Sequence, residues 1–311
     1  MVSEFALIDR LFRRPTRHTV LGVGDDGALI QPSPGQQLVV STDLLVENTH
    51  FFPSVDPRDL GWKTLAVNVS DLAAMGAQPR WATLAAVLPA PTFDELHPFA
   101  DGFFACADAF GIDLIGGDTT RGPRAFCVTI FGEVPAGAAL RRDGAQRGDS
   151  IWISGHPGRA ALGLAHLQGR TVLPEPQLSL CLHALHRLQP RLSLGLALRG
   201  LATAAIDISD GLLAYLGHIL QNSQRSAQLR IPGLPADPLA RACLLSGGDD
   251  YELAFTAPAA CDDAVRALAA TLPLPLTRIG HIDDGLPGQF TLIDDMGTPI
   301  HPERLGYDHF A

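Results

Sequence analysis

Stretches of helix-like and strand-like polarity alternate along the first half of the chain. Apolar side chains recur at Leu65, Val69, Leu72 and Met75, which is the spacing of one helix face and predicts a helix over residues 59–75. Shorter apolar runs bounded by polar or glycine residues predict strands. By these criteria we expect strands over 38–40, 81–88, 113–115 and 126–134, and a second helix over 93–110 that ends at Gly111.

A second alternating unit follows a stretch without apolar periodicity. Residues 135–149 are rich in Gly, Ala and Arg, so we place a domain boundary there and expect domains of 1–137 and 138–311. In the second domain we expect helices over 159–168, 177–188 and 211–221, and strands over 150–153, 204–208, 251–256 and 276–282. The sequence therefore predicts a mixed α/β (α+β) protein of two domains.

Composition narrows the function by exclusion. The chain has 311 residues with 23 basic and 33 acidic side chains, a formal charge of −10, which argues against non-specific binding to nucleic acid. We find neither a signal-peptide pattern nor an apolar run of about 18 residues, and expect a cytoplasmic protein without a membrane partner. Five scattered cysteines without a C-x-x-C pair predict reduced thiols.

The segment from Gly22 to Gly27 has the letters of the dinucleotide fingerprint G-x-G-x-x-G. That fingerprint needs a helix N-terminus for the pyrophosphate, whereas this loop carries the carboxylates Asp25 and Asp26 and leads to prolines. Two carboxylates can face a phosphate only with a cation between them. A solvated turn is the alternative interpretation.

Further carboxylates stand beside glycines, at predicted strand ends or, in one case, on a predicted helix. They are Asp43 after Ser41-Thr42, Asp71 on the first predicted helix, Asp118 after Gly116-Gly117, Asp207 and Asp210 around Ser209, and Asp249 and Asp250 after Gly247-Gly248. Each has an ordinary alternative, such as a turn, a helix N-cap at Ser209 or Asp210, or an arginine partner for Asp71. Because Mg²⁺ takes one or two carboxylates plus substrate phosphates, their recurrence predicts several magnesium ions around a nucleoside triphosphate.

Several familiar catalytic motifs are missing. Lys63 is the only lysine and follows Trp62, so the chain has no G-K-[ST] phosphate loop. It also has no protein-kinase H-R-D, no G-x-S-x-G and no H-E-x-x-H. His183 and His186 have helical spacing but no third ligand nearby, and we interpret them as surface residues. The pattern favours an ATP- and magnesium-dependent small-molecule kinase of another fold.

The ordered motifs resemble those of the thiamine-monophosphate kinase family, within the superfamily of aminoimidazole-ribonucleotide synthetase, selenophosphate synthetase and a hydrogenase maturation factor. The resemblance covers nearly the whole chain. Its motifs are Glu4-Phe5 with Leu7-Ile8-Asp9, Gly24-Asp25-Asp26, Ser41-Thr42-Asp43, Asn68-Val69-Ser70-Asp71-Leu72, Gly116-Gly117-Asp118, Asp207-Ile208-Ser209-Asp210-Gly211 and Gly247-Gly248-Asp249-Asp250-Tyr251-Glu252. It implies a two-domain PurM-like fold whose N-terminal domain closes a barrel across a homodimer, with a C-terminal α/β domain.

The resemblance also implies a reaction, the transfer of the γ-phosphoryl group of ATP to thiamine monophosphate, and roles for individual residues. Positions that match magnesium ligands are Asp26, Ser41, Thr42, Asp43, Asp71, Asp118, Asp207 and Asp210. Positions that match ATP contacts are Gly117, Asp118, Arg142 and Ser209, and those that match thiamine monophosphate contacts are His50, Asp249 and Tyr307. The residues expected to carry catalysis are Asp26, Asp43, Asp71, Asp118, Arg142 and Asp207.

Two positions depart from the family pattern. Asp249 stands where glutamate is common, and Tyr307 where tryptophan is common. Asp249 keeps the charge and Tyr307 keeps a stacking face, so we expect binding to survive. Two other functions stay open from the sequence: another ATP-using reaction of the superfamily, such as that of selenophosphate or aminoimidazole-ribonucleotide synthetase, and a non-catalytic nucleotide- or metal-binding role.

Overall fold

The computed structural model describes residues 4–294 and 296–308. The chain forms two compact units. Unit 1 contains residues 1–72 and 77–137, and unit 2 contains residues 73–76 and 138–311. Each unit has a sheet and helices of its own, so the expected mixed α/β class is confirmed.

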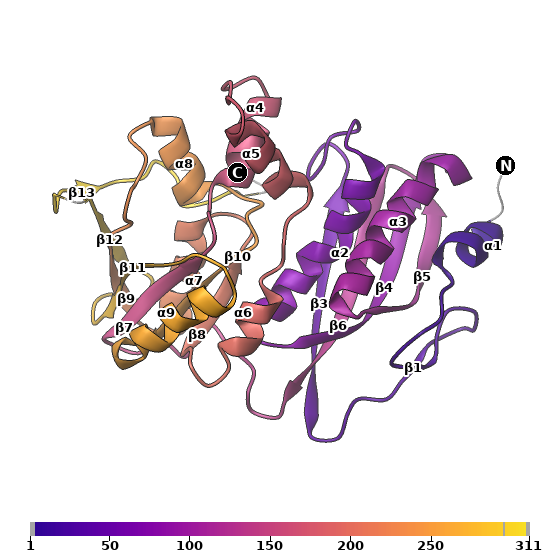
Figure 1. The fold of residues 1–311 in the computed structure, drawn as a ribbon, viewed down its shortest axis with the longest axis horizontal. Helices are drawn as coiled ribbons and strands as arrows, with labels where there is room; N and C mark the ends of the chain where they lie inside the picture. The colour runs from indigo at the N-terminus through magenta and orange to yellow at the C-terminus, as the bar shows by residue number, and fades with distance from the viewer. Residues whose placement is uncertain (1–3, 295, 309–311) are drawn as a thin grey trace. The chain divides into compact units, whose positions relative to one another are not determined.

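Among its described residues, unit 1 has a four-stranded sheet in the order β3-β6-β4-β5. The strands are β3 (Gln36–Val46), β4 (Gln78–Leu88), β5 (Asp113–Arg121) and β6 (Ala125–Pro135). All neighbours pair antiparallel except β4 and β5, which are parallel. The helices α2 (Pro57–Ala74) and α3 (Phe93–Phe110) lie side by side along this sheet (Figure 1).

Local sequence signals fix both ends of α3. Thr92 accepts a hydrogen bond from the N–H of Glu95 while the Glu95 side chain accepts from Thr92, a reciprocal cap of the first turn. Gly111 ends the helix in the left-handed conformation, with φ of 69°. Gly102 lets α3 approach α2, because a Cβ there would lie 1.8 Å from the carbonyl oxygen of Arg58.

The chain before β3 is tied to the far edge strand of unit 1. It forms α1 (Glu4–Leu7), η1 (Ile8–Phe12), β1 (Thr19–Leu21) and β2 (Leu29–Ile30). The buried carboxylate of Asp113, the first residue of β5, accepts from the backbone N–H groups of Arg17 and His18 and from the Thr19 hydroxyl. Three donors, one of them shared between the two carboxylate oxygens, satisfy a carboxylate that burial would otherwise penalise.

Burial alternates along β3, as it does in a strand with one covered face. Ser41, Asp43 and Leu45 are at least partly buried, whereas Leu38, Val40 and Leu44 are 40%, 55% and 52% exposed. Their register partners on β6 include Phe131 opposite Val40 and Cys127 opposite Leu44. This second face of the sheet, called the open face below, exposes these apolar side chains to solvent.

Unit 2 contains a seven-stranded sheet within the part of the chain that the structure describes. Its order is β13 (Pro299–Ile300), β12 (Phe290–Ile293), β9 (Ser226–Leu229), β11 (Leu276–Asp283), β7 (Asp149–Ser154), β10 (Glu252–Pro258) and β8 (Ala204–Ile208). The pairs are antiparallel except β12 with β9. Its helices are α4 (Arg159–Leu167), α5 (Gln177–His186), α6 (Leu192–Ala197), α7 (Leu212–Asn222), α8 (Pro238–Ser246), η2 (Ala259–Cys261) and α9 (Asp262–Thr271).

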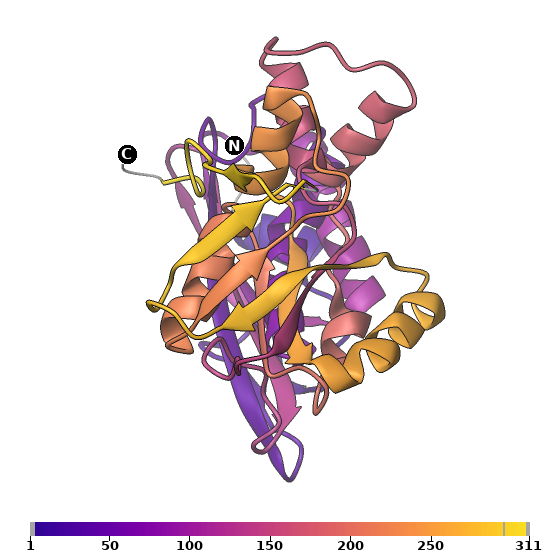
Figure 2. The ribbon, with the colours of Figure 1, turned by 90° about the vertical axis from the view of Figure 1, so that its left-hand side faces the viewer.

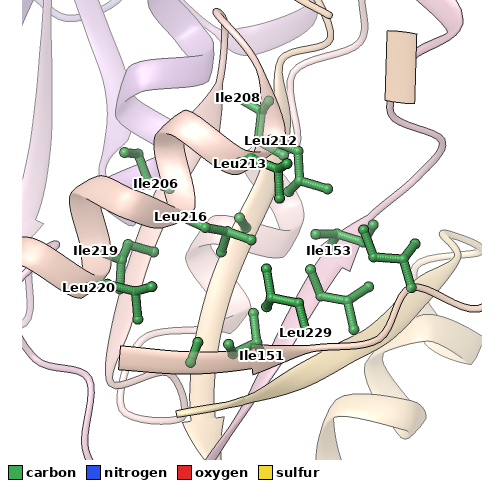
Figure 3. Packing of buried hydrophobic residues seen from close by; sticks show 14 of the residues in the cluster. Ile151, Ile153, Ile206, Ile208, Leu212, Leu213, Leu216, Ile219, Leu220 and Leu229 are labelled. Carbon is green, nitrogen blue, oxygen red and sulfur yellow. The ribbon is translucent and has the colours of Figure 1, made fainter. Parts of the chain in front are cut away.

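Different helices pack on the two faces of this sheet. Leu213, Leu216 and Leu220 of α7 pack on Ile151 and Ile153 of β7 in one buried cluster (Figure 3). The intervening β7 residue Trp152 points to the other face, where Arg266 of α9 lies 5.8 Å from its ring centroid. Figure 2 shows α7 and α9 on opposite sides of the strands.

Most of the expected elements are present, with differences in their extents. The helix over 93–110 and the strand over 204–208 have the predicted bounds. In contrast, β3 runs on through Ser41, Thr42 and Asp43, and β5 runs on through Gly116, Gly117 and Asp118. The interpretation of these segments as strand ends or turns was wrong, because pairing with β6 and β4 keeps them extended.

Two further expectations concern thiols and membranes. All five cysteines lie in the described part of the chain, and no disulfide joins them there. Within residues 4–294 and 296–308, no helix is long and apolar enough to cross a bilayer.

Candidate functional site

In unit 1, β3 and α2 bring three of the sequence-predicted residues together. The Ser41 hydroxyl donates to Oδ2 of Asp71 across 2.6 Å. Two residues along, the N–H of Asp43 donates to Oδ1 of Asn68 across 3.1 Å. Ser41, Asp43 and Asp71 therefore line one strip between strand and helix.

Asn68 fixes the position of the Asp43 backbone beside α2. Its side chain is fully buried, accepts from Asp43 N–H and donates through Nδ2 to the carbonyl of Thr64 one helical turn earlier. A buried amide with both ends satisfied is rigid. The sequence motif contains Asn68, but its role became visible only when β3 was paired with α2.

Thr42 faces the other way. Its hydroxyl lies 2.9 Å from that of Thr129 on the open face, because successive side chains of a strand point to opposite faces. Thr42 can therefore join Ser41 and Asp43 at one cation only through its backbone.

Gly117 and Asp118 lie at the opposite edge of the same sheet. Asp43, Val128, Leu84 and Gly117 form one row of register partners across β3, β6, β4 and β5. Three inter-strand spacings put Gly117 about 14 Å from Asp43. Only glycine fits here, since φ is 152° and a Cβ would lie 1.8 Å from the Leu84 carbonyl oxygen.

His50 and Asp26 lie outside the strip. Nδ1 of His50 accepts from the N–H of Val46, and His50 N–H donates to the Val46 carbonyl across 2.8 Å. The backbone bond closes the turn after β3. Because Nδ1 accepts a hydrogen bond, a neutral His50 carries its ring hydrogen on Nε2. Asp26 is exposed in the loop after β1, where its N–H donates to the Asp25 carboxylate.

In unit 2, three segments far apart in sequence meet at the end of β8. Asp249 N–H donates to the Ser209 carbonyl across 2.6 Å, and Tyr307 N–H donates to the Asp210 carbonyl across 2.7 Å. The Ser246 hydroxyl links the other two segments by donating to the carbonyl of Arg304. Backbone hydrogen bonds thus gather Ser209, Asp210, Asp249 and Tyr307 around one loop, which we call the β8–α7 loop (residues 209–211).

The backbone around Asp249 is held in an uncommon conformation. Asp249 has φ of 68° and Tyr251 φ of 50°, in the left-handed region that non-glycine residues rarely occupy. The bonds to Ser209 and from Tyr251 N–H to the Ile208 carbonyl stabilise both turns. Backbone strain of this kind, which the surrounding structure must offset, is concentrated at functional sites.

Asp250 and Glu252 have structural roles instead. Asp250 accepts from Gly158 N–H at the start of α4, and burial raises its pKa well above the usual value. Glu252 is buried and accepts two 2.6 Å bonds from the guanidinium of Arg191. Of the acidic residues in this motif, Asp249 is the one whose backbone bonds to the β8–α7 loop.

The side chains of the β8–α7 loop are held by Tyr215 of α7. Its hydroxyl oxygen lies 2.5 Å from Ser209 Oγ and 3.0 Å from Asp210 Oδ2. The alternative of an N-cap at Ser209 or Asp210 is wrong, because α7 begins after Gly211 and has no side-chain cap. Burial is the main cause that raises the pKa of Tyr215 above its usual value, so the phenol stays protonated.

Asp207 and Arg142 occupy different places in unit 2. Asp207 is buried near the end of β8, opposite Leu253 of β10. The Arg142 carbonyl accepts from the hydroxyl of Ser223, the residue after α7. Ser209 lies before the start of α7, and Ser223 follows its end. With a rise of about 1.5 Å per residue, the length of α7 therefore separates the Arg142 backbone from Ser209 by about 16 Å.

A cavity in unit 2 contains none of these residues. It measures about 450 Å³ and is lined by α4, α5 and their neighbours, including His156, Arg159 and Cys181. Burial, then the charge of Arg159, lowers the pKa of His156.

Across residues 4–294 and 296–308, no three His, Cys, Asp or Glu side chains are grouped closely enough to form a metal site by themselves. Magnesium does not need such a cage, since it retains waters and binds one or two carboxylates together with substrate phosphates. The pair of Ser41 and Asp71 fits that requirement.

The chain resembles known proteins along its whole length. Residues 24–134 match the family described as AIR synthase related protein, N-terminal domain. The chain is 44% identical to thiamine-monophosphate kinase of Salmonella typhimurium, covering 99% of this chain and 98% of that one. It is 33% identical to thiamine-monophosphate kinase of Bacillus subtilis, covering 99% and 100%.

Solved structures show the same resemblance to thiamine-monophosphate kinases. Thiamine-monophosphate kinase from Stenotrophomonas maltophilia K279a is 48% identical, with a TM-score of 0.83 over 96% of this chain and 98% of that one. AaThiL complexed with AMPPCP and TMP is 27% identical, with a TM-score of 0.75 over 98% and 97%. The Escherichia coli hydrogenase maturation protein HypE, 20% identical with a TM-score of 0.78 over 98% and 97%, shares the fold.

Proposed function

The chain belongs to the thiamine-monophosphate kinase family, and we propose that it phosphorylates thiamine monophosphate with ATP, giving thiamine diphosphate and ADP, the final step of thiamine diphosphate synthesis. The observation that carries the proposal is 44% identity over 99% of the chain to a protein of that name. A relative of similar fold has been solved with AMPPCP, an ATP analogue, and TMP.

The residue roles follow the positions matched in the sequence. The magnesium ligands would be Asp26, Ser41, Asp43, Asp71, Asp118, Asp207 and Asp210, with Thr42 contributing its backbone. The ATP contacts would be Gly117, Asp118, Arg142 and Ser209, and the thiamine monophosphate contacts His50, Asp249 and Tyr307. Residues 1–137 would bind ATP and magnesium and form the dimer, and residues 138–311 would complete the site.

The reaction does not require a general base. The acceptor is a phosphate monoester, already largely ionised at neutral pH, so no side chain has to remove a proton. Bound magnesium would neutralise charge on the transferred phosphoryl group. Arg142 supplies further positive charge, and Gly117 allows the backbone to approach a phosphate closely.

A homodimer is part of the proposal. The open face exposes Leu38, Val40 and Leu44, and apolar patches of this kind commonly mark an interface. Pairing two such sheets would close the barrel expected from the family. It would also bring the Asp43 edge of one copy toward the Asp118 edge of the other, which lie about 14 Å apart in a single sheet.

The deciding experiment is a direct assay. Purified protein is incubated with ATP, MgCl₂ and thiamine monophosphate, and thiamine diphosphate is quantified by chromatography. Product in proportion to enzyme is the expected result. Absence of product beside an active thiamine-monophosphate kinase control would overturn the proposal, and ATP binding without transfer to any phosphorylated acceptor would then favour a binding role.

A further inference from the structure

Tyr215 makes the shortest side-chain contact of the β8–α7 loop. Three oxygens form a triangle: Tyr215 Oη is 2.5 Å from Ser209 Oγ and 3.0 Å from Asp210 Oδ2, and Ser209 Oγ is 3.3 Å from Asp210 Oδ2. A contact of 2.5 Å between two hydroxyl oxygens requires a hydrogen between them. The contact is therefore a hydrogen bond and not chance proximity.

The direction of the bonds follows from counting hydrogens. An ionised carboxylate only accepts, and each hydroxyl has one hydrogen to give. The arrangement that satisfies both short contacts has Ser209 donating to Tyr215 and Tyr215 donating to Asp210. Chained bonds of this kind polarise and strengthen one another, and the last one is assisted by the carboxylate charge.

The tyrosine ring is itself anchored. It packs against the buried cluster between α7 and the sheet and meets His218 edge-on, with the ring centroids 5.6 Å apart. Its N–H donates to the Gly211 carbonyl in the first turn of α7. The hydroxyl therefore sits at a point fixed by the core, whereas Ser209 and Asp210 lie on a loop.

We propose that Tyr215 is a positioning residue that pre-orients the Ser209 hydroxyl and the Asp210 carboxylate for the metal-bound nucleotide. The proposal rests on the roles of Ser209 and Asp210 in the proposed function. In the described part of the chain, the hydrogen bonds of the Asp210 carboxylate go to Oδ2, so holding that oxygen leaves Oδ1 for a cation. Pre-orientation removes the rotamer freedom that binding would otherwise have to freeze.

The test is Tyr215→Phe, which removes the hydroxyl and keeps the ring. Loss of one charge-assisted hydrogen bond should weaken Mg²⁺-ATP binding roughly tenfold, measured as Kd by calorimetry and as KM for ATP. The melting temperature should stay close to that of the wild type. Thr271→Val, which removes a hydroxyl bonded only to its own helix α9, is the matched control and should change neither value.

A mutant cycle separates positioning from general damage. If Tyr215 acts through Ser209 and Asp210, Tyr215→Phe should have little further effect on Kd in a background that carries both Ser209→Ala and Asp210→Asn. Additive losses, an unchanged Kd in the single variant, or a loss that only parallels a falling melting temperature would each overturn the inference. A wild type that binds Mg²⁺-ATP but forms no product would refute the proposed function while leaving this test in force.

Discussion

The hydroxyl of Ser41 on β3 donates to Asp71 Oδ2 on α2 across 2.6 Å. Asn68, one turn earlier on α2, holds the backbone of Asp43 in the same strip. A helix and a strand that the sequence only places in succession thus present a hydroxyl and two carboxylates together. In the proposed enzyme this strip supplies three of the magnesium ligands of unit 1.

Asp71→Asn tests this strip. The amide keeps the size of the side chain but removes the negative charge, so kcat should fall by about a hundredfold or more, with a small change in melting temperature. Steady-state kinetics at several magnesium concentrations and differential scanning calorimetry measure the two effects. Asp263→Asn, at an exposed position of α9, should keep full activity, and full activity of Asp71→Asn itself would contradict the metal role.

Tyr307→Ala tests recognition of the acceptor. Tyr307 is 56% exposed, and its N–H bond to the Asp210 carbonyl survives the substitution. Loss of the stacking face should raise KM for thiamine monophosphate roughly tenfold and leave KM for ATP unchanged. Tyr307→Phe keeps the ring and should behave like the wild type; an equal rise in both KM values would argue against a specific acceptor contact.

Val40→Asp tests the open face. A carboxylate in the middle of an apolar dimer interface would be buried without a partner, so the protein should become monomeric in light scattering coupled to size-exclusion chromatography. Val172→Asp, at a position of unit 2 that is 86% exposed, serves as the control and should keep the wild-type mass. A wild type that is already monomeric would reject the proposed homodimer.

Mixing two inactive variants tests whether the site is shared between copies. In a mixed dimer of Asp43→Asn and Asp118→Asn chains, one of the two sites would contain both wild-type aspartates. After subunit exchange, activity should recover to about a quarter of the wild-type rate, because half of the dimers are mixed and each has one intact site. No recovery, despite exchange verified by mass spectrometry, would place both aspartates in the site of one copy.

Glu133→Gln tests a buried ion pair in unit 1. Burial alone would raise the pKa of Glu133, but bonds from Ser33 and Arg80 outweigh it, so the pKa lies below its usual 4.5. Folding then favours the carboxylate, and its contribution is present above pH 4.5 and lost as the pH falls through the lowered pKa.

The substitution should therefore cost about 2 kcal/mol of unfolding free energy at pH 7. The difference from the wild type should shrink in denaturant titrations at progressively acidic pH. Glu303→Gln, at an exposed side chain, should leave the whole curve unchanged. A pH-independent difference at position 133 would show that packing, and not charge, is lost.

The sequence by itself determined the elements whose signals are local. The helix over 93–110 was predicted to the residue, because apolar spacing and the left-handed Gly111 act within a few residues of its ends. The motifs in family order also identified the family and each candidate residue. Short strands such as β9, β12 and β13, and the helices α6, α8 and α9, were not predicted, since their apolar runs are brief and gain stability from neighbours distant in sequence.

Only the tertiary structure decided which residues of the acidic motifs lie at the candidate site and which have structural roles. Asp249 and Asp250 are adjacent and chemically alike, yet one bonds to the β8–α7 loop by its backbone and the other accepts from the start of α4. Gly117 lies in a strand because β4 pairs with it, and Asp43 stands at the opposite edge because β6 and β4 come between. Pairing, register and side-chain direction join residues far apart in the chain, and the local pattern of polarity contains no information about which partner each will meet.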